Sequence, residues 1–226
     1  MNRRAMFAMV FAVAFGLVAP VAAQGPMGGG PPTPAMRGIW SPVVGSGAAY
    51  DMEAKGRKGT MEFAIVGTEP AMGKTGHWLE MMFKDPRQGE MVMKSLIVLD
   101  DKNTRVVKMV MYSPEMGAIE FPIEMMGRTG QSPVQEADVR ASGELIGTES
   151  VTTPAGTFSC QHYRGKDKDG NLYDVWVAEQ VAPYGLVKMT SKDSSMVLTR
   201  VITGARTRVV GTPRNMRDMM QQRPPQ

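Results

Sequence analysis

Apolar and polar residues alternate with period two along most of the chain, and turn-forming residues interrupt the alternation every ten or so positions. In the run 48–54, for example, Tyr50 and Met52 alternate with Asp51 and Glu53. Successive side chains of a strand point to opposite faces of its sheet, so this pattern predicts strands with one buried face. We expect about eleven strands, at 48–54, 61–65, 77–83, 91–99, 105–112, 119–123, 144–151, 157–164, 172–178, 186–191 and 196–203.

The short gaps between these runs favour antiparallel hairpins. Between two of the runs stands Thr153-Pro154-Ala155-Gly156, whose proline and glycine suit a type I turn with a glycine bulge. A flat sheet of so many strands would present long edges, so we expect it to curl. The predicted fold is all-β, or β-rich α+β: a curved antiparallel sheet or open half-barrel with at most one or two short helices, for which Ser132–Glu136 and Pro213–Gln222 are the candidate segments.

The two ends of the chain lack the alternation. Residues 1–23 begin with Arg3 and Arg4, continue as an uncharged apolar run and end in Val21-Ala22-Ala23, the layout of a secretory signal peptide cleaved near Ala23. The apolar run is short for a membrane span, so we expect no integral membrane segment after cleavage. We predict a flexible Gly/Pro linker at 24–38, an antiparallel β domain at 39–210 and a disordered basic Pro/Gln tail at 211–226.

Charge and cysteine content narrow the class of protein. Removing residues 1–23 takes away two arginines, so the 26 basic residues of the chain become 24 against 22 acidic ones. No basic stripe lies within the predicted domain, and we expect no nucleic-acid partner. Cys160 is the single cysteine and cannot form an intramolecular disulfide, so a periplasmic or secreted domain of this kind must be held by its hydrophobic core.

Methionine is the unusual component, with 22 residues of this type. Met91 with Met93, and Met109 with Met111, stand two apart and therefore project as pairs from one face of their strands. Three interpretations are open: ordinary core packing, an adaptable lining for a flexible apolar ligand, or a thioether site for copper(I).

A binding site drawn from these residues would include tryptophans at its rim. Trp78 and Trp176 stand beside alternating apolar residues, where a tryptophan serves either as a core anchor or as a wall of a ligand pocket. Our candidate ligand-binding residues are Trp78, Met91, Met93, Met109, Met111, Trp176 and Met189.

We predict no catalytic residues, no metal ligands and no cofactor. His77 and His162 are the only histidines, and Cys160 and His162 share a strand face without a third ligand that the sequence can name. No phosphate loop, dinucleotide fingerprint or nucleophile elbow is present, and several glutamates, among them Glu62 and Glu80, give no basis for choosing a glycosidase pair.

Three segments in the second half resemble a known class of protein. They are Gly147–Phe158 around the Pro-Ala-Gly-Thr-Phe turn, Val175–Ala178 with its tryptophan, and Pro183–Met189 with its Pro-Tyr-Gly-Leu run. Together they resemble uncharacterised exported bacterial β domains, which are similar in layout to the lipoprotein-carrier half-barrel of the Lol system. The resemblance implies a periplasmic, non-enzymatic binder of apolar ligands in a Gram-negative bacterium.

The leading hypothesis is therefore an exported carrier for a lipid or acyl chain held in the concave sheet. The first alternative is an envelope interaction or scaffold protein with a filled core, which touches a protein partner or anionic surface through its basic tail. The second alternative is a methionine-based copper(I)-handling protein.

Overall fold

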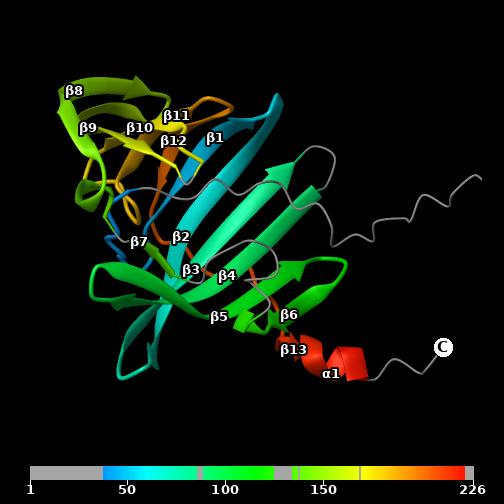
Figure 1. Ribbon diagram of the computed structural model, residues 1–226. Coiled ribbons are helices and arrows are strands. Elements are labelled where there is room, and N and C mark those ends of the chain that lie inside the picture. Colours follow the sequence, from blue (N-terminus) through cyan, green and yellow to red (C-terminus); the bar gives the residue numbers. More distant parts are fainter. Residues whose placement is uncertain (1–37, 86–88, 125–133, 137, 168, 222–226) are drawn as a thin grey trace, which may run out of the picture. The chain divides into compact units, whose positions relative to one another are not determined.

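The computed structural model describes residues 38–85, 89–124, 134–136, 138–167 and 169–221, and these form one sheet with a single α-helix (Figure 1). The sheet is antiparallel except where Arg214–Asn215 runs parallel to Ile119–Glu120. The strands are β1 (Gly47–Ala54), β2 (Arg57–Ala71), β3 (Lys74–Asp85), β4 (Gly89–Asp100), β5 (Asn103–Ser113), β6 (Gly117–Phe121), β7 (Val134–Glu136), β8 (Glu144–Thr153), β9 (Gly156–Lys166), β10 (Leu172–Val177), β11 (Leu186–Ser191), β12 (Ser194–Ile202) and β13 (Arg214–Asn215). The helices are the 3-10 helix η2 (Val139–Ala141) and α1 (Met216–Gln221). The predicted signal peptide and residues 24–37 of the predicted linker lie outside the described residues and stay predictions, whereas Gly38 is described and buried.

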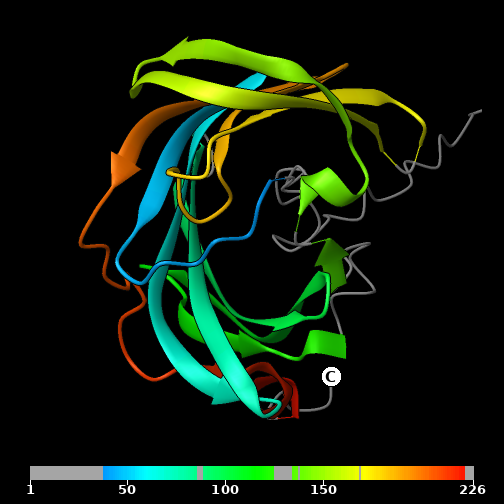
Figure 2. The same ribbon diagram turned by 90° about the vertical axis from the view of Figure 1, so that its left-hand side faces the viewer.

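The sheet is built from two runs of neighbouring hairpins joined at one seam. Its strand order is β13-β6-β5-β4-β3-β2-β1-β12-β11-β10-β9-β8, with β7 also paired to β5. At the seam, β12 returns to pair antiparallel with β1. The sheet curls, with β8–β9 at one end and β5–β6 at the other, and the described strands do not close into a barrel (Figure 2). The predicted open, curved antiparallel sheet is confirmed, and no helix of the described residues is long and apolar enough to cross a membrane.

The concave face of the sheet carries the hydrophobic core. On β1 and β2 the inward residues Tyr50, Met61, Phe63 and Ile65 are at most 1% exposed. Each buried side chain of this size contributes about 2 kcal/mol through the area it removes from water. The strands form where they do because such residues recur at every second position, as the sequence predicted.

The convex face is covered by a segment that the sequence pattern did not reveal. Residues 203–213 leave β12 and run along the outside of β1 and β2, seen in orange and red in Figure 2. The Arg208 backbone N–H donates to both carboxylate oxygens of Glu80 at 2.9 and 3.0 Å, and the Thr207 hydroxyl donates to Glu80 at 2.7 Å. We call residues 203–215 the C-terminal strap.

Two local expectations differ from the structure. The segment 211–226 was expected to be a disordered tail in which 213–222 was a candidate helix; Arg214–Asn215 pairs with β6, and Met216–Gln221 is helical. A helix was expected near 132–136, whereas Val134–Glu136 pairs with β5 and only the three-residue η2 follows. In both places a few backbone hydrogen bonds to a strand distant in sequence determine the structure, and no local pattern of apolar residues predicts these bonds.

Candidate functional site

Three methionines form a continuous row across the concave face. Met93 on β4 pairs directly with Met81 on β3 and with Met111 on β5. Directly opposed side chains in an antiparallel sheet have Cβ atoms about 5 Å apart, so the three thioethers are immediate neighbours. We call Met81, Met93 and Met111 the first methionine row; all three are half-buried.

A second row of the same kind lies on the same concave face, across the seam. Met196 on β12 pairs with Met189 on β11 and with Met52 on β1. These three, the second methionine row, are 0%, 4% and 6% exposed respectively and belong to the core. The two rows have similar register but different access to solvent. The second row packs in the core, whereas a ligand can contact the first row.

The side chains around the first methionine row are also apolar and incompletely buried. Met91 and Phe83 are paired neighbours one step along β4 and β3, and Met109 pairs with Phe121 of β6. Met109 is 7% exposed, while Phe83, Met91 and Phe121 are half-buried. The prediction that Met91, Met93, Met109 and Met111 share a face agrees with this register.

The two tryptophans of the candidate site do not join the methionines. Trp78 alternates with Leu79 and so lies on the convex face, where its indole N–H donates to Glu69 at 3.2 Å and Lys94 lies 4.8 Å from the ring centre. Trp176 alternates with Val175 and faces away from Met189 in the same manner. The alternation of residues along the strands could have shown this, because each tryptophan directly adjoins residues that face the core and must therefore point to the opposite face.

Four aromatic residues fill the concave side next to the first methionine row. Tyr184 lies 5.2 Å from Trp40 and 5.8 Å from Phe63, and Tyr50 lies 5.8 Å from Phe63, all between ring centres. Phe63 is itself the cross-strand partner of Met81. These residues, the aromatic plug, therefore pack on the concave face as far as the strand pair that carries Met81.

The plug is held by backbone contacts between three separate segments. The Ile39 N–H donates to the Tyr184 carbonyl at 2.6 Å, and the Val139 N–H donates to the Gly38 carbonyl at 2.8 Å. A Cβ on Gly38 would lie 2.2 Å from the Tyr184 carbonyl oxygen, so only glycine permits this approach.

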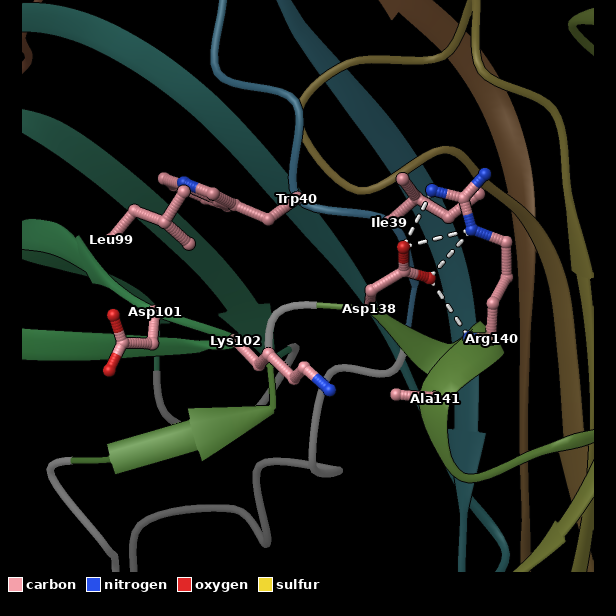
Figure 3. A pocket seen from close by; sticks show the side chains of 8 residues that line it. All are labelled: Ile39, Trp40, Leu99, Asp101, Lys102, Asp138, Arg140 and Ala141. Atoms are coloured by element: carbon pink, nitrogen blue, oxygen red, sulfur yellow. Dashed lines mark hydrogen bonds and ion pairs between the residues drawn. The ribbon is translucent and has the colours of Figure 1, made fainter.

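A cavity of about 480 Å³ opens beside the plug, at the β4–β5 turn (Figure 3). Ile39, Trp40 and Leu99 supply its apolar wall, and the Asp138–Arg140 ion pair lines the other side. Arg140 also pairs with Glu179, so its guanidinium is already engaged by two carboxylates. Although partial burial opposes the effect, hydrogen bonds from Arg140 lower the pKa of Asp138 and keep this pair charged.

A network of charged and aromatic residues occupies the convex face of β9–β11. His162 bonds to Asp174 at 2.7 Å and lies 3.2 Å from Glu149, and its ring stacks on Trp176 with 4.3 Å between centres. Lys188 lies 4.7 Å from the centre of the Trp176 ring. The indole is thus engaged by residues of both neighbouring strands, and this network has the character of a structural contact rather than of an open binding platform.

The remaining chemically distinctive residues are tied into the fold. Cys160 is completely buried, and desolvation, with a smaller contribution from Glu149, raises its pKa to about 11. Glu62 pairs with Arg200 and Arg208 on the convex face. Among the described residues, no group of three or more His, Cys, Asp or Glu side chains is placed to hold a metal ion.

The fold and the methionine-lined face define an open, curled β-sheet domain with an apolar concave side. The chain belongs to the family described as a domain of unknown function, DUF4412, whose model matches residues 52–223.

Three solved structures match the chain at low identity and with low TM-scores. A protein from Bacteroides fragilis described as exported and as having a YmcC-like fold is 13% identical, with a TM-score of 0.37 over 74% of this chain and 99% of that one. A protein from Parabacteroides distasonis described as a lipoprotein is 17% identical, with a TM-score of 0.39 over 74% and 99%. A β-barrel-like protein of the domain of unknown function DUF1849 from Brucella abortus is 13% identical, with a TM-score of 0.34 over 72% and 99%.

A comparison with curated proteins finds no match. The narrower resemblance to Lol carriers stays a prediction, and the functional argument below rests on the residues of this chain.

Proposed function

We propose that this protein is an exported, non-enzymatic carrier or binding protein that holds a flexible apolar group, such as an acyl chain, against the first methionine row. The observation that carries the proposal is the half-buried state of Met81, Met93 and Met111 on a concave face whose other methionine row is fully packed. Apolar side chains left partly open to water gain free energy when a ligand covers them.

The chemistry of this face favours an apolar ligand. The inward positions from Leu79 to Phe83, from Met91 to Ile97, from Met109 to Met111 and from Ile119 to Phe121 carry no charged side chain, and Ser95 is their one polar residue. Methionine is unbranched and repacks easily, so a wall of methionines suits ligands that vary in shape. A charged or strongly hydrogen-bonding ligand would find few partners here.

The scaffold alternative receives less support from the same contacts. It relied on a free basic tail, whereas Arg208 binds Glu62, Arg214 donates to the Met116 carbonyl at 2.8 Å, and Arg217 pairs with Glu124 at 3.0 Å. Arg208 and Arg214 hold the strap against the sheet, and Arg217 ties α1 to Glu124. The aromatic plug packs on the concave face as far as Phe63, which is the cross-strand neighbour of Met81 in the first methionine row.

Binding of a fluorescent fatty-acid probe tests the proposal. Wild-type protein is expected to bind the probe, and Met93→Lys is expected to weaken binding more than about tenfold, because a charge would be buried beneath the ligand. Met72→Lys is the matched control, since Met72 is 63% exposed in the β2–β3 turn, and it should bind as the wild type does. Circular dichroism checks that both variants fold.

Two results would reject the acyl-carrier proposal. One is a wild-type protein that binds no acyl probe and carries no lipid when native mass spectrometry is applied to material purified from its own envelope. The other is a folded Met93→Lys variant whose probe affinity equals that of the wild type.

A further inference from the structure

The first methionine row brings three thioethers together at partly exposed positions of one face. Three thioethers stand side by side on adjacent strands, with Met93 in direct register with both Met81 and Met111. Neighbouring strands lie about 4.8 Å apart, and each methionine side chain has three rotatable bonds beyond its Cα. Three such side chains on one face can turn their sulfur atoms toward a single point above Met93.

Access distinguishes this row from the second one. Met52, Met189 and Met196 have a comparable cross-strand register but are packed in the core, where an ion could enter only by displacing other side chains. Met81, Met93 and Met111 remain partly open to solvent. An ion arriving from solution can therefore reach the first row without unfolding the domain.

The donor atoms determine which metal would bind. Thioether sulfur is a soft ligand and suits copper(I), whereas calcium, magnesium and manganese require oxygen donors. The three ligands carry no charge, so they leave the charge of a bound cation uncompensated in apolar surroundings. A divalent ion would lose more hydration energy there than a monovalent one, and this disfavours zinc and copper(II).

We propose that Met81, Met93 and Met111 form a three-thioether site for a soft monovalent metal ion, copper(I) being the cation of this class. The inference does not depend on acyl-chain binding, although both use the same face. Met93 is the central ligand because it is the direct neighbour of the other two. Cys160, the one thiol of the chain, is buried in the core and is not part of this row.

Methionine-to-leucine substitutions separate the two uses of this face. Leucine keeps the apolar character and nearly the volume of methionine but has no sulfur. Met93→Leu should therefore lose metal affinity and still bind an acyl probe, so failure of one proposal can be told from failure of the other.

The experiment is a titration of the folded protein with copper(I) under anaerobic, reducing conditions against a colorimetric copper(I) chelator. We expect one ion per chain. Each of Met81→Leu, Met93→Leu and Met111→Leu should weaken copper(I) binding by at least about 10- to 100-fold, because loss of a residue that only supports a metal ligand already costs that much. Met196→Leu, the equivalent change at the centre of the second row, and Cys160→Ala should bind copper(I) as the wild type does. X-ray absorption of the loaded protein should show sulfur neighbours only.

Three outcomes would overturn the metal proposal. They are no copper(I) binding that competes with the chelator, unchanged affinity in folded Met93→Leu, and an equal loss of affinity in Met196→Leu. The melting temperature of each variant is compared with that of the wild type, so that loss of the metal site can be told from unfolding of the domain.

Discussion

Trp176 shows how single residues on the convex face stabilise the sheet without forming a binding site. Its ring lies between His162 of β9 and Lys188 of β11, and its indole N–H donates to Glu149 at 2.5 Å. His162 in turn bonds to Asp174, which also accepts a hydrogen bond from Arg164 at 2.9 Å. The polar atoms of this network satisfy one another, so a change in one of them should affect stability more than ligand binding.

Asp174 should contribute stability that depends on pH. Partial burial opposes the shift, but hydrogen bonds from Arg164 and His162 lower the pKa of this carboxyl below its ordinary value. A lowered pKa means that the stabilisation is complete above the unfolded pKa of about 3.9 and is lost as the pH falls through the folded value. Asp174→Asn is expected to lower the free energy of unfolding at pH 7 by about 1 kcal/mol, and the difference should vanish near pH 2.

Urea denaturation at several pH values measures this difference, with Asp193→Asn in the exposed β11–β12 turn as the control. A deficit of the Asp174 variant that is the same at pH 7 and pH 2 would contradict the assigned role.

Cys160 should react very slowly in the folded protein. Its side chain is fully buried, and its pKa is raised to about 11, so the reactive thiolate is scarce at neutral pH. Alkylation with iodoacetamide at pH 8, followed by mass spectrometry, should label the unfolded chain at least about 100-fold faster than the native one. Rapid labelling of native protein would show that the thiol is accessible and that β9 is not packed as described.

At the scale of elements, the C-terminal strap is the part of the fold that cannot be predicted from hairpins between neighbouring strands. It links β12 to β6 across the convex face through contacts between residues more than 120 positions apart, such as Thr207 with Glu80. The Glu80 side chain is completely buried and accepts hydrogen bonds only from the strap in the described residues. Lifting the strap would remove these hydrogen bonds from a carboxylate that is completely buried, which is costly for a charged group.

Arg208→Ala is expected to lower the free energy of unfolding by about 2 kcal/mol, because it leaves Glu62, a nearly buried carboxylate, with one fewer cation. Arg217→Ala is the matched control, since its partner Glu124 is 75% exposed and such pairs contribute little. Chemical denaturation of the two variants measures the difference. Equal stability of the two would mean that the strap is not held through this arginine.

The elements and the antiparallel hairpins between neighbouring strands could largely be predicted from the sequence, whereas the register and the pairing of β1 with β12 could not. Alternation located all eleven long strands near their observed places because burial of one face repeats every second residue. It missed β7 and β13, which have three and two residues and no pattern of their own. Met81 was also missed as a site residue, because its role depends on the register that places it opposite Met93.

The tryptophans show the opposite case, in which the sequence held a signal that was not used. Leu79, Met81 and Phe83 alternate in the same run as Trp78, so a strict count of positions already places Trp78 on the other face. The same holds for Trp176 between Val175 and Val177.

At the scale of the whole described domain, the concave face has a fully buried part and a partly exposed part. The aromatic plug and the second methionine row pack against one another across the seam of β1 and β12. The first methionine row, on β3 to β5, lies beyond Phe63 and stays partly open. This division lets a rigid core hold a soft apolar wall in place, which is the arrangement expected of a site that accepts flexible ligands.

Photo-crosslinking with a diazirine-labelled fatty acid, followed by peptide mapping, tests this central claim most directly. The proposal predicts that the labelled peptides contain Phe83, Met93 and Met111, and that unlabelled fatty acid in excess removes the signal. Labels confined to the convex face around Trp78 and Trp176, or no labelling that excess fatty acid suppresses, would contradict it.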